Sequence, residues 1–249
     1  MVGSGNDFIV IQGNPRGNLS KLAKLLCDRR FGIGADGLLL LNKHKNADLA
    51  MRIFNADGSQ AQMCGNGARC AAFFNGQRRA RLFTGAGIIN TEVFGNRVRI
   101  QLTRPKALKL DIPLKVNNRQ IKVNFVNTGV PHTIIFVKGI AGINVHSIGS
   151  QIRRHNKFAP AGTNVNFLEV IGPDIIRIRT YERGVEGETL ACGTGSTAAA
   201  LIFALKNKLN NLVKVQTQGG ETLKVYFKRI DDKFENVWLE GSAKIVYKG

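Results

Sequence analysis

The sequence predicts an α+β protein built from two copies of one unit. Strand-like apolar segments alternate with helix-like ones, and segments of the first half recur in the same order in the second. Each half also holds a cysteine followed by a Gly-x-Gly segment and then by an Ala- and Phe-containing run typical of a helix. The interval between the copies is close to half the chain length, which indicates a duplicated pair and not a longer repeat array.

The first half predicts a regular order of elements. Alternating or continuous apolar residues indicate strands over residues 6–12, 37–42 and 49–55. A helix is expected over residues 20–32, with Ser20 as its N-cap and Gly32 just beyond its end.

A second helix is expected to begin at Cys64 and to stop at Asn75 and Gly76. Residues 90–103 predict two strands around a Gly-Asn turn. After Pro105 the chain is polar, and we expect an irregular stretch up to about residue 119.

The second half repeats these elements at a nearly constant interval. The matching pairs are GNDFIV from Gly5 with GVPHTI from Gly129, FGIGADGLLLL from Phe31 with FAPAGTNVNFLEV from Phe158, CGNG from Cys64 with CGTG from Cys192, and TEVFGNRVRI from Thr91 with ETLKVYFKRI from Glu221. These matches predict an N-terminal lobe over residues 1–118 and a C-terminal lobe over residues 119–249. The extreme C-terminal strand is a candidate to pair with the N-terminal lobe.

Composition indicates an ordinary globular protein. The chain has 249 residues, 43% of them hydrophobic, and only six prolines. Its longest apolar run, residues 198–205, is too short to cross a bilayer, and its first residues show no signal-peptide pattern. We therefore expect a cytoplasmic protein without a membrane partner.

The chain is strongly basic, with a formal net charge of +19 and a pI near 10.3. Such a charge can mark a nucleic-acid partner. Here Lys and Arg are scattered, no basic run is interleaved with aromatic residues, and no nucleic-acid-binding motif is present. Nucleic acid is therefore not expected as the main partner, although a basic nucleic-acid-binding protein stays an alternative.

The four cysteines form neither a CxxC pair nor a His/Cys cluster, so neither a metal site nor a disulfide scaffold is expected. We interpret Cys27 and Cys70 as small apolar core residues. Cys64 and Cys192 differ, because each stands where a helix begins, and the positive end of a helix dipole favours thiolate. A redox-sensing thiol pair is one alternative for them.

Two such thiols on opposite sides of an amino-acid α-carbon could invert it. One thiolate would remove the α-proton while the other thiol delivers a proton to the opposite face. The backbone N–H groups of each Gly-x-Gly turn could hold the carboxylate and stabilise the charge that develops. No lysine lies in an obvious Schiff-base context and no P-loop or dinucleotide fingerprint is present, so no cofactor is expected.

Long motifs of the chain resemble the diaminopimelate epimerase family. They are GSGNDFIVI, RRFGIGADGLLLL, RIFNADGSQAQMCGNGARC, NTGVPH, GTNVNF and YERGVEGETLACGTGSTAAA. The resemblance implies two pseudo-symmetric lobes, each a β-sheet wrapped around a central α-helix, with the active site in the cleft between them. It also implies a cofactor-independent reaction that interconverts LL- and meso-2,6-diaminopimelate for lysine and peptidoglycan synthesis, and a homodimer.

The resemblance also assigns roles to individual residues. Cys64 and Cys192 fall on the acid/base pair, and His132 falls on a histidine that helps to set the protonation of the thiols. The remaining matches are Gly65, Asn66, Gly193 and Thr194 as helix-end donors to the reacting carboxylate, Asn6, Asn55 and Asn164 as substrate-binding asparagines, and Glu182 and Arg183 as partners of a substrate ammonium group and the distal carboxylate.

The chain departs from the family pattern in two positions. Val130 stands where many relatives have an asparagine, and Gly37 stands where some have a glutamine, so neither is expected to supply a side-chain contact. The chain also starts almost on its first motif, which suggests a clipped or later start. A proline or hydroxyproline racemase is the nearest alternative activity, and the Glu182 and Arg183 pair argues against it.

Overall fold

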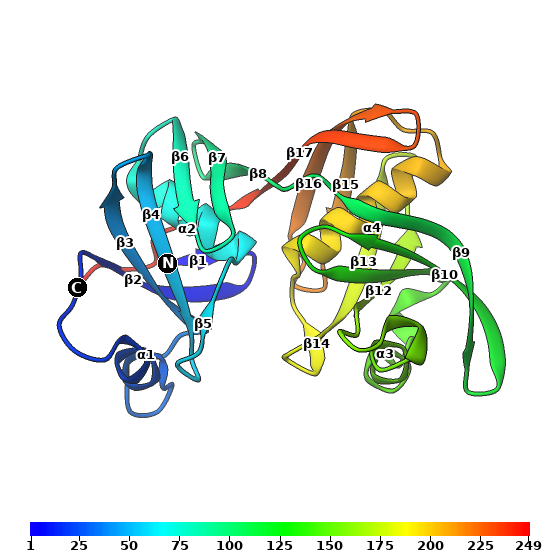
Figure 1. The fold of residues 1–249 in the computed structure, drawn as a ribbon, viewed down its shortest axis with the longest axis horizontal. Coiled ribbons are helices and arrows are strands. Elements are labelled where there is room, and N and C mark those ends of the chain that lie inside the picture. Colours follow the sequence, from blue (N-terminus) through cyan, green and yellow to red (C-terminus); the bar gives the residue numbers. More distant parts are fainter. The chain divides into compact units, whose positions relative to one another are not determined.

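The computed structural model describes residues 1–249, which form two compact units. Unit 1 comprises Met1–Gln101 and Glu240–Gly249, and unit 2 comprises Leu102–Leu239. In each unit, strands surround one buried helix (Figure 1). No helix in either unit has the length and apolar character that crossing a bilayer requires.

Unit 1 contains two helices and a set of short strands. Its elements are β1 (Val2–Gly3), β2 (Asn6–Gln12), α1 (Leu19–Cys27), β3 (Gly37–His44), β4 (Ala47–Asn55), β5 (Gln60–Ala61), α2 (Gly65–Asn75), β6 (Arg79–Thr84), β7 (Gly87–Phe94) and β8 (Arg97–Gln101).

Unit 2 contains the corresponding elements and a long additional hairpin. Its elements are β9 (Lys106–Val116), β10 (Arg119–Asn127), β11 (Pro131–Phe136), α3 (Val145–Arg153), β12 (Asn164–Val170), β13 (Ile175–Glu182), β14 (Gly187–Thr189), α4 (Gly193–Lys206), β15 (Leu212–Gln216), β16 (Thr222–Ile230) and β17 (Lys233–Ser242), with single 3-10 turns at Ile140–Gly142 and Asn156–Phe158. The residues of β17 from Glu240 onward belong to unit 1.

The strand pairing of unit 2 repeats that of unit 1. In unit 1, β2 is parallel to β3, β3 is antiparallel to β4, and β4 is parallel to β6. In unit 2, β11 is parallel to β12, β12 is antiparallel to β13, and β13 is parallel to β15. Parallel neighbours require a crossover, and in both units helices supply it. The predicted duplicated α+β fold is confirmed.

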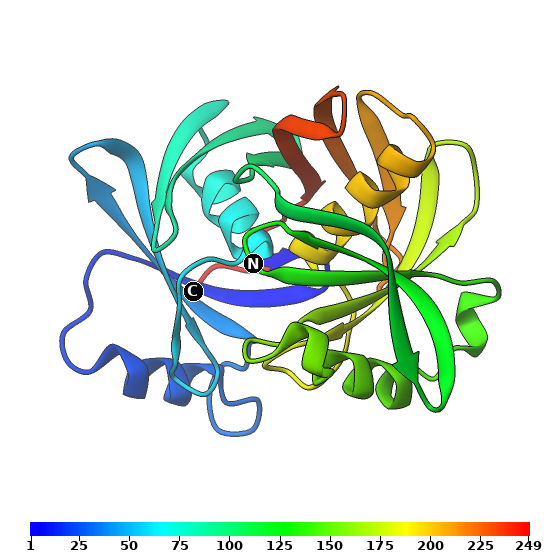
Figure 2. The ribbon, with the colours of Figure 1, turned by 45° about the vertical axis from the view of Figure 1, so that its right-hand side comes forward.

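The buried helices α2 and α4 lie inside their own units, among the strands (Figure 2). Helix α4 is buried continuously from Gly195 to Leu205, and its alanines let strands approach it from several sides. A helix that is apolar on all sides is one that must be enclosed. The predicted end of the Cys64 helix is also confirmed, because Gly76 caps α2 with a left-handed φ of 74°.

Helix α1 differs from its prediction at both ends. Its N-cap is Asn18, whose Oδ1 accepts the N–H of Lys21 at 3.1 Å, so Ser20 lies inside the helix. The helix ends at Cys27 because the next residue, Asp28, accepts the N–H groups of Arg30 and Phe31 at 2.7 and 2.8 Å. These bonds fold the chain into a turn instead of a further helical turn.

The stretch expected to be irregular after Pro105 is the strand β9, so that prediction was wrong. Its many charged residues concealed a period-two pattern of apolar residues, which runs over Leu108, Leu110, Ile112, Leu114 and Val116. Leu114 and Val116 are buried, and the strand pairs with β10 through two register shifts. The predicted lobe boundary at residue 118 falls in the turn of this hairpin.

The C-terminal residues belong to unit 1. Lys244 pairs with Val2 through two backbone hydrogen bonds of 2.9 and 3.0 Å, and Ala243 donates its N–H to the carbonyl of Asn96. The last residues thus join the sheet of unit 1 next to β1.

Candidate active site

Cys64 is the N-cap of α2. Its backbone is extended, with φ −138° and ψ 123°, and its Sγ accepts the N–H of Gly67 at 3.5 Å. Serine, threonine, aspartate or asparagine usually takes this position, so the thiol does the work of a cap with a weaker acceptor. The start of the helix also favours the thiolate form of Cys64, so a cysteine at this position has a chemical use that the usual cap residues lack.

A chain of polar contacts follows Cys64 in unit 1. Asn66 donates from Nδ2 to Asn6 Oδ1 at 2.5 Å, and its own Oδ1 accepts from the guanidinium of Arg69 at 2.7 Å. Arg69 is fully buried and also donates to Ser4 Oγ at 2.5 Å. Because a guanidinium only donates, it fixes the orientation of the Asn66 amide and therefore that of Asn6.

Asn6 completes this chain with a bond that sequence reasoning did not predict. Its Nδ2 donates to Asp36 Oδ2 at 2.9 Å, and Asp36 is itself paired with Arg29. The structure thus gathers Asn6, Asn66 and the Cys64 cap in one region. Asn55 ends β4 and instead donates from Nδ2 to Ser59 Oγ, at 2.9 Å, in the turn before β5.

Cys192 is the N-cap of α4 and is 7% exposed. The Cys192 Sγ lies 3.5 Å from Thr194 Oγ1. The thiol of Cys192 also forms a hydrogen bond with the carboxyl group of Glu182. Glu182 also accepts from Thr189 Oγ1 at 3.0 Å. Burial raises the pKa of Glu182, and the hydrogen bonds from Thr189 and Cys192 oppose part of that rise. A thiol and a carboxyl with a perturbed pKa therefore lie in contact.

His132, on β11, is completely buried. Its Nδ1 lies 3.1 Å from Asn166 Nδ2, and its Nε2 has no hydrogen-bond partner. Burial, and then the positive charge of Arg183, lower the pKa of His132 to about 3. The ring is therefore neutral near pH 7.

Asn164 and Arg183 form a connected pair in unit 2. Asn164 Oδ1 accepts the backbone N–H of Arg183 at 2.8 Å, and its Nδ2 donates to the carbonyl of Pro131 at 3.0 Å. The guanidinium of Arg183 donates to the carbonyl of Ala161 at 2.7 Å. Together with the influence of Arg183 on His132, these bonds bring Asn164, Arg183 and His132 into one region of unit 2.

Sequence reasoning missed several supporting residues. Asp36 orients Asn6, Asn166 contacts His132, and Thr128 donates from Oγ1 to the backbone carbonyl of Thr194 at 3.0 Å. One signal was available in the motif GTNVNF: Asn164 and Asn166 are two residues apart, so on a strand they share a face.

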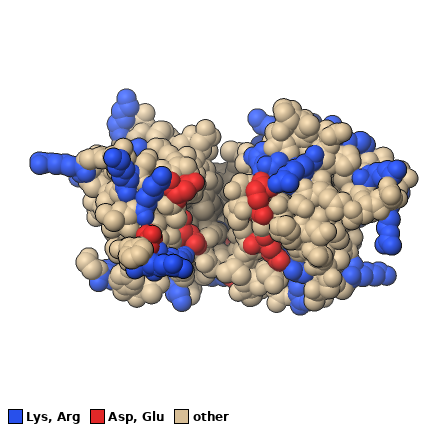
Figure 3. Space-filling model, turned by 90° about the horizontal axis from the view of Figure 1, so that it is seen from below, with Lys and Arg blue, Asp and Glu red and all other residues tan.

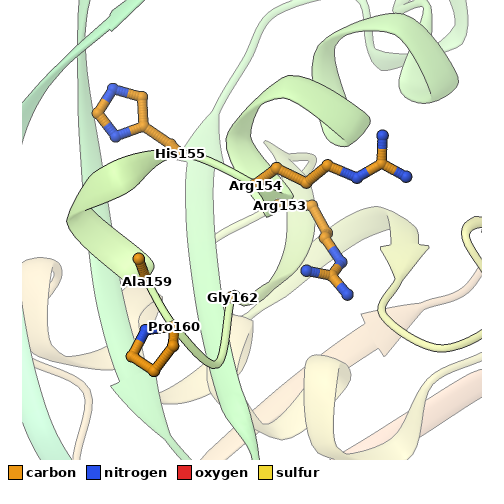
Figure 4. Close-up of a pocket in the computed structure, with 6 residues that line it drawn as sticks. All are labelled: Arg153, Arg154, His155, Ala159, Pro160 and Gly162. Atoms are coloured by element: carbon orange, nitrogen blue, oxygen red, sulfur yellow. The ribbon is translucent and has the colours of Figure 1, made fainter.

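A small cavity lies elsewhere in unit 2. Its volume is about 200 Å³, and its lining residues are Arg153, Arg154, His155, Ala159, Pro160 and Gly162 (Figure 4). Both arginines pair with Glu186, at 2.9 and 3.6 Å. The cavity is lined by none of the predicted site residues.

On the face that Figure 3 shows, the basic charge does not form one patch. Lys and Arg side chains are spread over the visible face of both units (Figure 3). Many of them are paired, as Arg179 is with Glu188 at 2.7 Å and Lys206 with Asp111 at 2.8 Å. No three His, Cys, Asp or Glu side chains gather in an arrangement that could hold a metal ion.

Solved structures define the class of fold. A phenazine biosynthesis protein of the PhzF family from Bacillus anthracis matches with a TM-score of 0.74 at 16% identity, over 96% of this chain and 91% of that one. A probable proline racemase from Agrobacterium radiobacter K84, solved with bound carbonate, matches with a TM-score of 0.69 at 18% identity, over 99% and 92%. The chain therefore has the fold of PhzF proteins and proline racemases.

Sequence comparisons define the family within that class. The profile described as Diaminopimelate epimerase matches residues 1–107 and 124–246. The diaminopimelate epimerase of Aquifex aeolicus is 41% identical, over 99% of this chain and 94% of the relative, and that of Chlorobaculum tepidum is 43% identical, over 100% and 98%. This chain belongs to the diaminopimelate epimerase family.

Proposed function

We propose that this enzyme interconverts LL- and meso-2,6-diaminopimelate in lysine biosynthesis, without a cofactor, using Cys64 and Cys192 as acid and base. One observation carries the assignment of the residues: in both units the equivalent buried helix starts from a cysteine. Family membership supplies the substrate and the reaction class, an amino-acid epimerisation.

The chemistry requires both thiols to reach one α-carbon. A thiolate removes the α-proton, so that the C–H bond breaks, an S–H bond forms, and the electron pair stays on the substrate as an enolate-like anion. The second thiol then gives its proton to the opposite face of that carbon, which inverts the stereocentre. The reverse reaction exchanges the roles of the two sulfurs, and each step is general acid–base catalysis.

The helix starts supply donors for the reacting carboxylate. The first helical hydrogen bonds run from Ala68 N to Cys64 O and from Ser196 N to Cys192 O, both at 2.8 Å. The amides of the first two residues of each helix lie before these bonds and outside the helical ladder. Those residues are Gly65 and Asn66 in α2 and Gly193 and Thr194 in α4. Such N–H groups stabilise negative charge that develops on the carboxylate.

Polar side chains around the two cysteines would recognise the rest of the substrate. Arg183 suits the distal carboxylate through a charge-assisted hydrogen bond, and Glu182 suits an ammonium group. The asparagines Asn6, Asn55 and Asn164 offer further donors and acceptors. His132 and Glu182 would influence the protonation of the thiols.

Hydrogen exchange tests the proposal directly. Purified protein in deuterated water, without added cofactor, should place deuterium on the α-carbon of the inverted product from LL- and from meso-diaminopimelate. L-Proline serves as the comparison substrate and should not exchange. Absence of exchange with both diaminopimelate isomers would contradict the proposed function, and exchange with L-proline alone would assign the chain to the racemase activity.

We further propose that the enzyme works in the cytoplasm as a homodimer, as its family resemblance implies. Light scattering coupled to gel filtration measures the mass in solution, and a mass of 27.2 kDa would contradict the dimer.

A further inference from the structure

The first turn of each buried helix packs on equivalent strand positions in the two units. A Cβ added at Gly67 of α2 would lie 3.1 Å from Leu39 Cδ2 and 3.4 Å from Ile53 Cδ1. A Cβ added at Gly195 of α4 would collide with Asn166 Oδ1. Leu39 pairs with Ile53 across β3 and β4 as Asn166 pairs with Thr180 across β12 and β13.

The neighbouring parallel strand completes the equivalence. In unit 1, Phe8 of β2 is in register with Gly37, two residues before Leu39. In unit 2, His132 of β11 is in register with Asn164, two residues before Asn166. Three equivalent positions thus carry hydrocarbon in unit 1 and polar groups in unit 2, namely Phe8, Leu39 and Ile53 against His132, Asn166 and Thr180.

The fold does not require polar residues at these positions. His132 and Asn166 are 0% exposed and Thr180 is 2% exposed, so all three are removed from water. Burying polar groups costs free energy that only good hydrogen bonds recover. Unit 1 has the same backbone arrangement with apolar side chains at these positions. The polar set under α4, which is His132, Asn166 and Thr180, therefore has a purpose other than folding.

Asn166 is held in one orientation. One of its amide atoms lies 3.2 Å from the backbone carbonyl of Thr133, which can only accept, so that atom is the Nδ2 donor. Its Oδ1 accepts from Thr180 Oγ1 at 3.0 Å. The second hydrogen of Nδ2 is then left for His132 Nδ1, at 3.1 Å.

This orientation determines where His132 carries its proton. Because Nδ1 accepts from Asn166, it is unprotonated, and a neutral imidazole then has its hydrogen on Nε2. Burial and Arg183 hold the pKa of His132 at about 3, which keeps the ring neutral near pH 7. Nε2 is buried without a partner, and a donor left in this state is available to a group that binds.

We propose that Asn166 is a positioning residue, which holds His132 as the neutral Nε2–H tautomer so that the ring donates a hydrogen bond in the Cys192 site and cannot act as a base there. The only unprotonated ring nitrogen is occupied by Asn166, so His132 cannot take the proton of Cys192. The place of His132 in catalysis rests on the proposed function, whereas its tautomer does not.

Nitrogen NMR of the imidazole rings tests the tautomer without reference to activity. The protein has four histidines, so the His132 signals are assigned by their loss in His132→Gln. In the wild type we expect a protonated Nε2 and an unprotonated Nδ1. In Asn166→Asp the carboxylate accepts from Nδ1–H, so the proton should move from Nε2 to Nδ1, with a loss of kcat of about tenfold or more.

Two further variants separate positioning from structural damage. Asn124 is 2% exposed, and its Nδ2 donates to the β11 carbonyl of Ile134 without touching His132. Asn124→Asp is therefore the matched control, and should keep the Nε2–H tautomer and wild-type kcat. The double variant Asn166→Leu with Thr180→Ile copies the apolar pair of unit 1; it should fold, lose the single tautomer and lose kcat.

The outcomes separate this inference from the proposed function. A wild-type His132 protonated at Nδ1, or an Asn166→Asp variant that retains both Nε2–H and wild-type kcat, overturns the role of Asn166. A protein with the expected tautomer that exchanges no α-hydrogen of diaminopimelate instead overturns the proposed function.

Discussion

The two cysteine-capped helices share a backbone arrangement but not a chemical environment. Around Cys64 the polar contacts run along the helix, through Asn66 to the buried Arg69, and the strands beneath carry hydrocarbon. Around Cys192 the polar contacts lie on the strands beneath, in His132 and Asn166, and a carboxyl group touches the sulfur.

This comparison shows which features the two copies share and which differ between them. Both copies kept a thiol at the start of the helix and a glycine where that helix meets the strands. The charged and titratable groups near the two helix starts differ, with a buried cation on the helix in unit 1 and a neutral histidine and Glu182 in unit 2. We infer that the two sulfurs occupy equivalent positions within their units, but that different neighbouring groups influence their protonation.

Replacing either sulfur should have the largest effect. Cys64→Ser and Cys192→Ser each lower kcat/KM by about 10²–10⁴-fold, because a hydroxyl is a far weaker base than a thiolate. Kinetics in both reaction directions, with circular dichroism as the control for folding, measure this loss. Near-normal turnover in either variant would contradict the assigned roles.

The two equivalent glycines should respond differently to the same added methyl group. Gly195→Ala places its Cβ against Asn166 Oδ1 and 3.3 Å from Cys192 Sγ, so we expect the free energy of unfolding to fall by about 1–3 kcal/mol.

Gly67→Ala meets the flexible ends of Leu39 and Ile53, at 3.1 and 3.4 Å, and alanine favours the helix. We therefore expect a change within about 1 kcal/mol of the wild type. Urea unfolding measures the free energy of unfolding of both variants. An equal loss of this free energy in the two variants would show that the polar residues under α4 are no more rigid than the apolar residues at the equivalent positions of unit 1.

Glu182→Gln should change how stability depends on pH. Burial raises the pKa of Glu182 in the folded state, so the wild type is favoured while the group is protonated and loses that advantage as pH rises through the raised pKa. The variant has no such loss, so its stability relative to the wild type should increase from acidic to neutral pH, while kcat falls. Denaturant titrations across that range measure the free energy of unfolding of both proteins. A free energy of unfolding of the variant that falls relative to that of the wild type as pH rises would contradict the sign.

The buried cysteines Cys27 and Cys70 should be the least sensitive to alkylation, and substituting Cys70 should have the smallest effect on activity. Burial raises the pKa of Cys70 to about 12, and that of Cys27 is also raised. Iodoacetamide, followed by peptide mass spectrometry, should therefore modify the half-buried Cys64 well before Cys27 or Cys70. Cys70→Ala should cost about 1 kcal/mol of stability and leave kcat unchanged. If iodoacetamide modified Cys70 as fast as Cys64, the predicted difference in reactivity between the helix-capping and the core cysteines would be wrong.

Much of the fold followed from local patterns. The duplication, the strands β2, β3 and β4, and the extent of α2 were predictable, because apolar periodicity and glycine caps act over a few residues. The strand β9 was not predicted, since its charged residues masked the alternation, and α1 shifted because Asn18 and Asp28 offered better caps than Ser20 and Gly32. Neighbouring side chains decide such boundaries.

For the site, the sequence by itself determined that each copy of the unit places a cysteine at the start of a helix, because the cysteine, the glycines and the helical run are adjacent in the chain. Only the tertiary structure decided what surrounds those cysteines. His132, Asn166 and Thr180 lie on three different strands, and strand pairing and register, not sequence distance, bring them under α4. The hydrogen bonds among them then fix a single proton position that no linear pattern could specify.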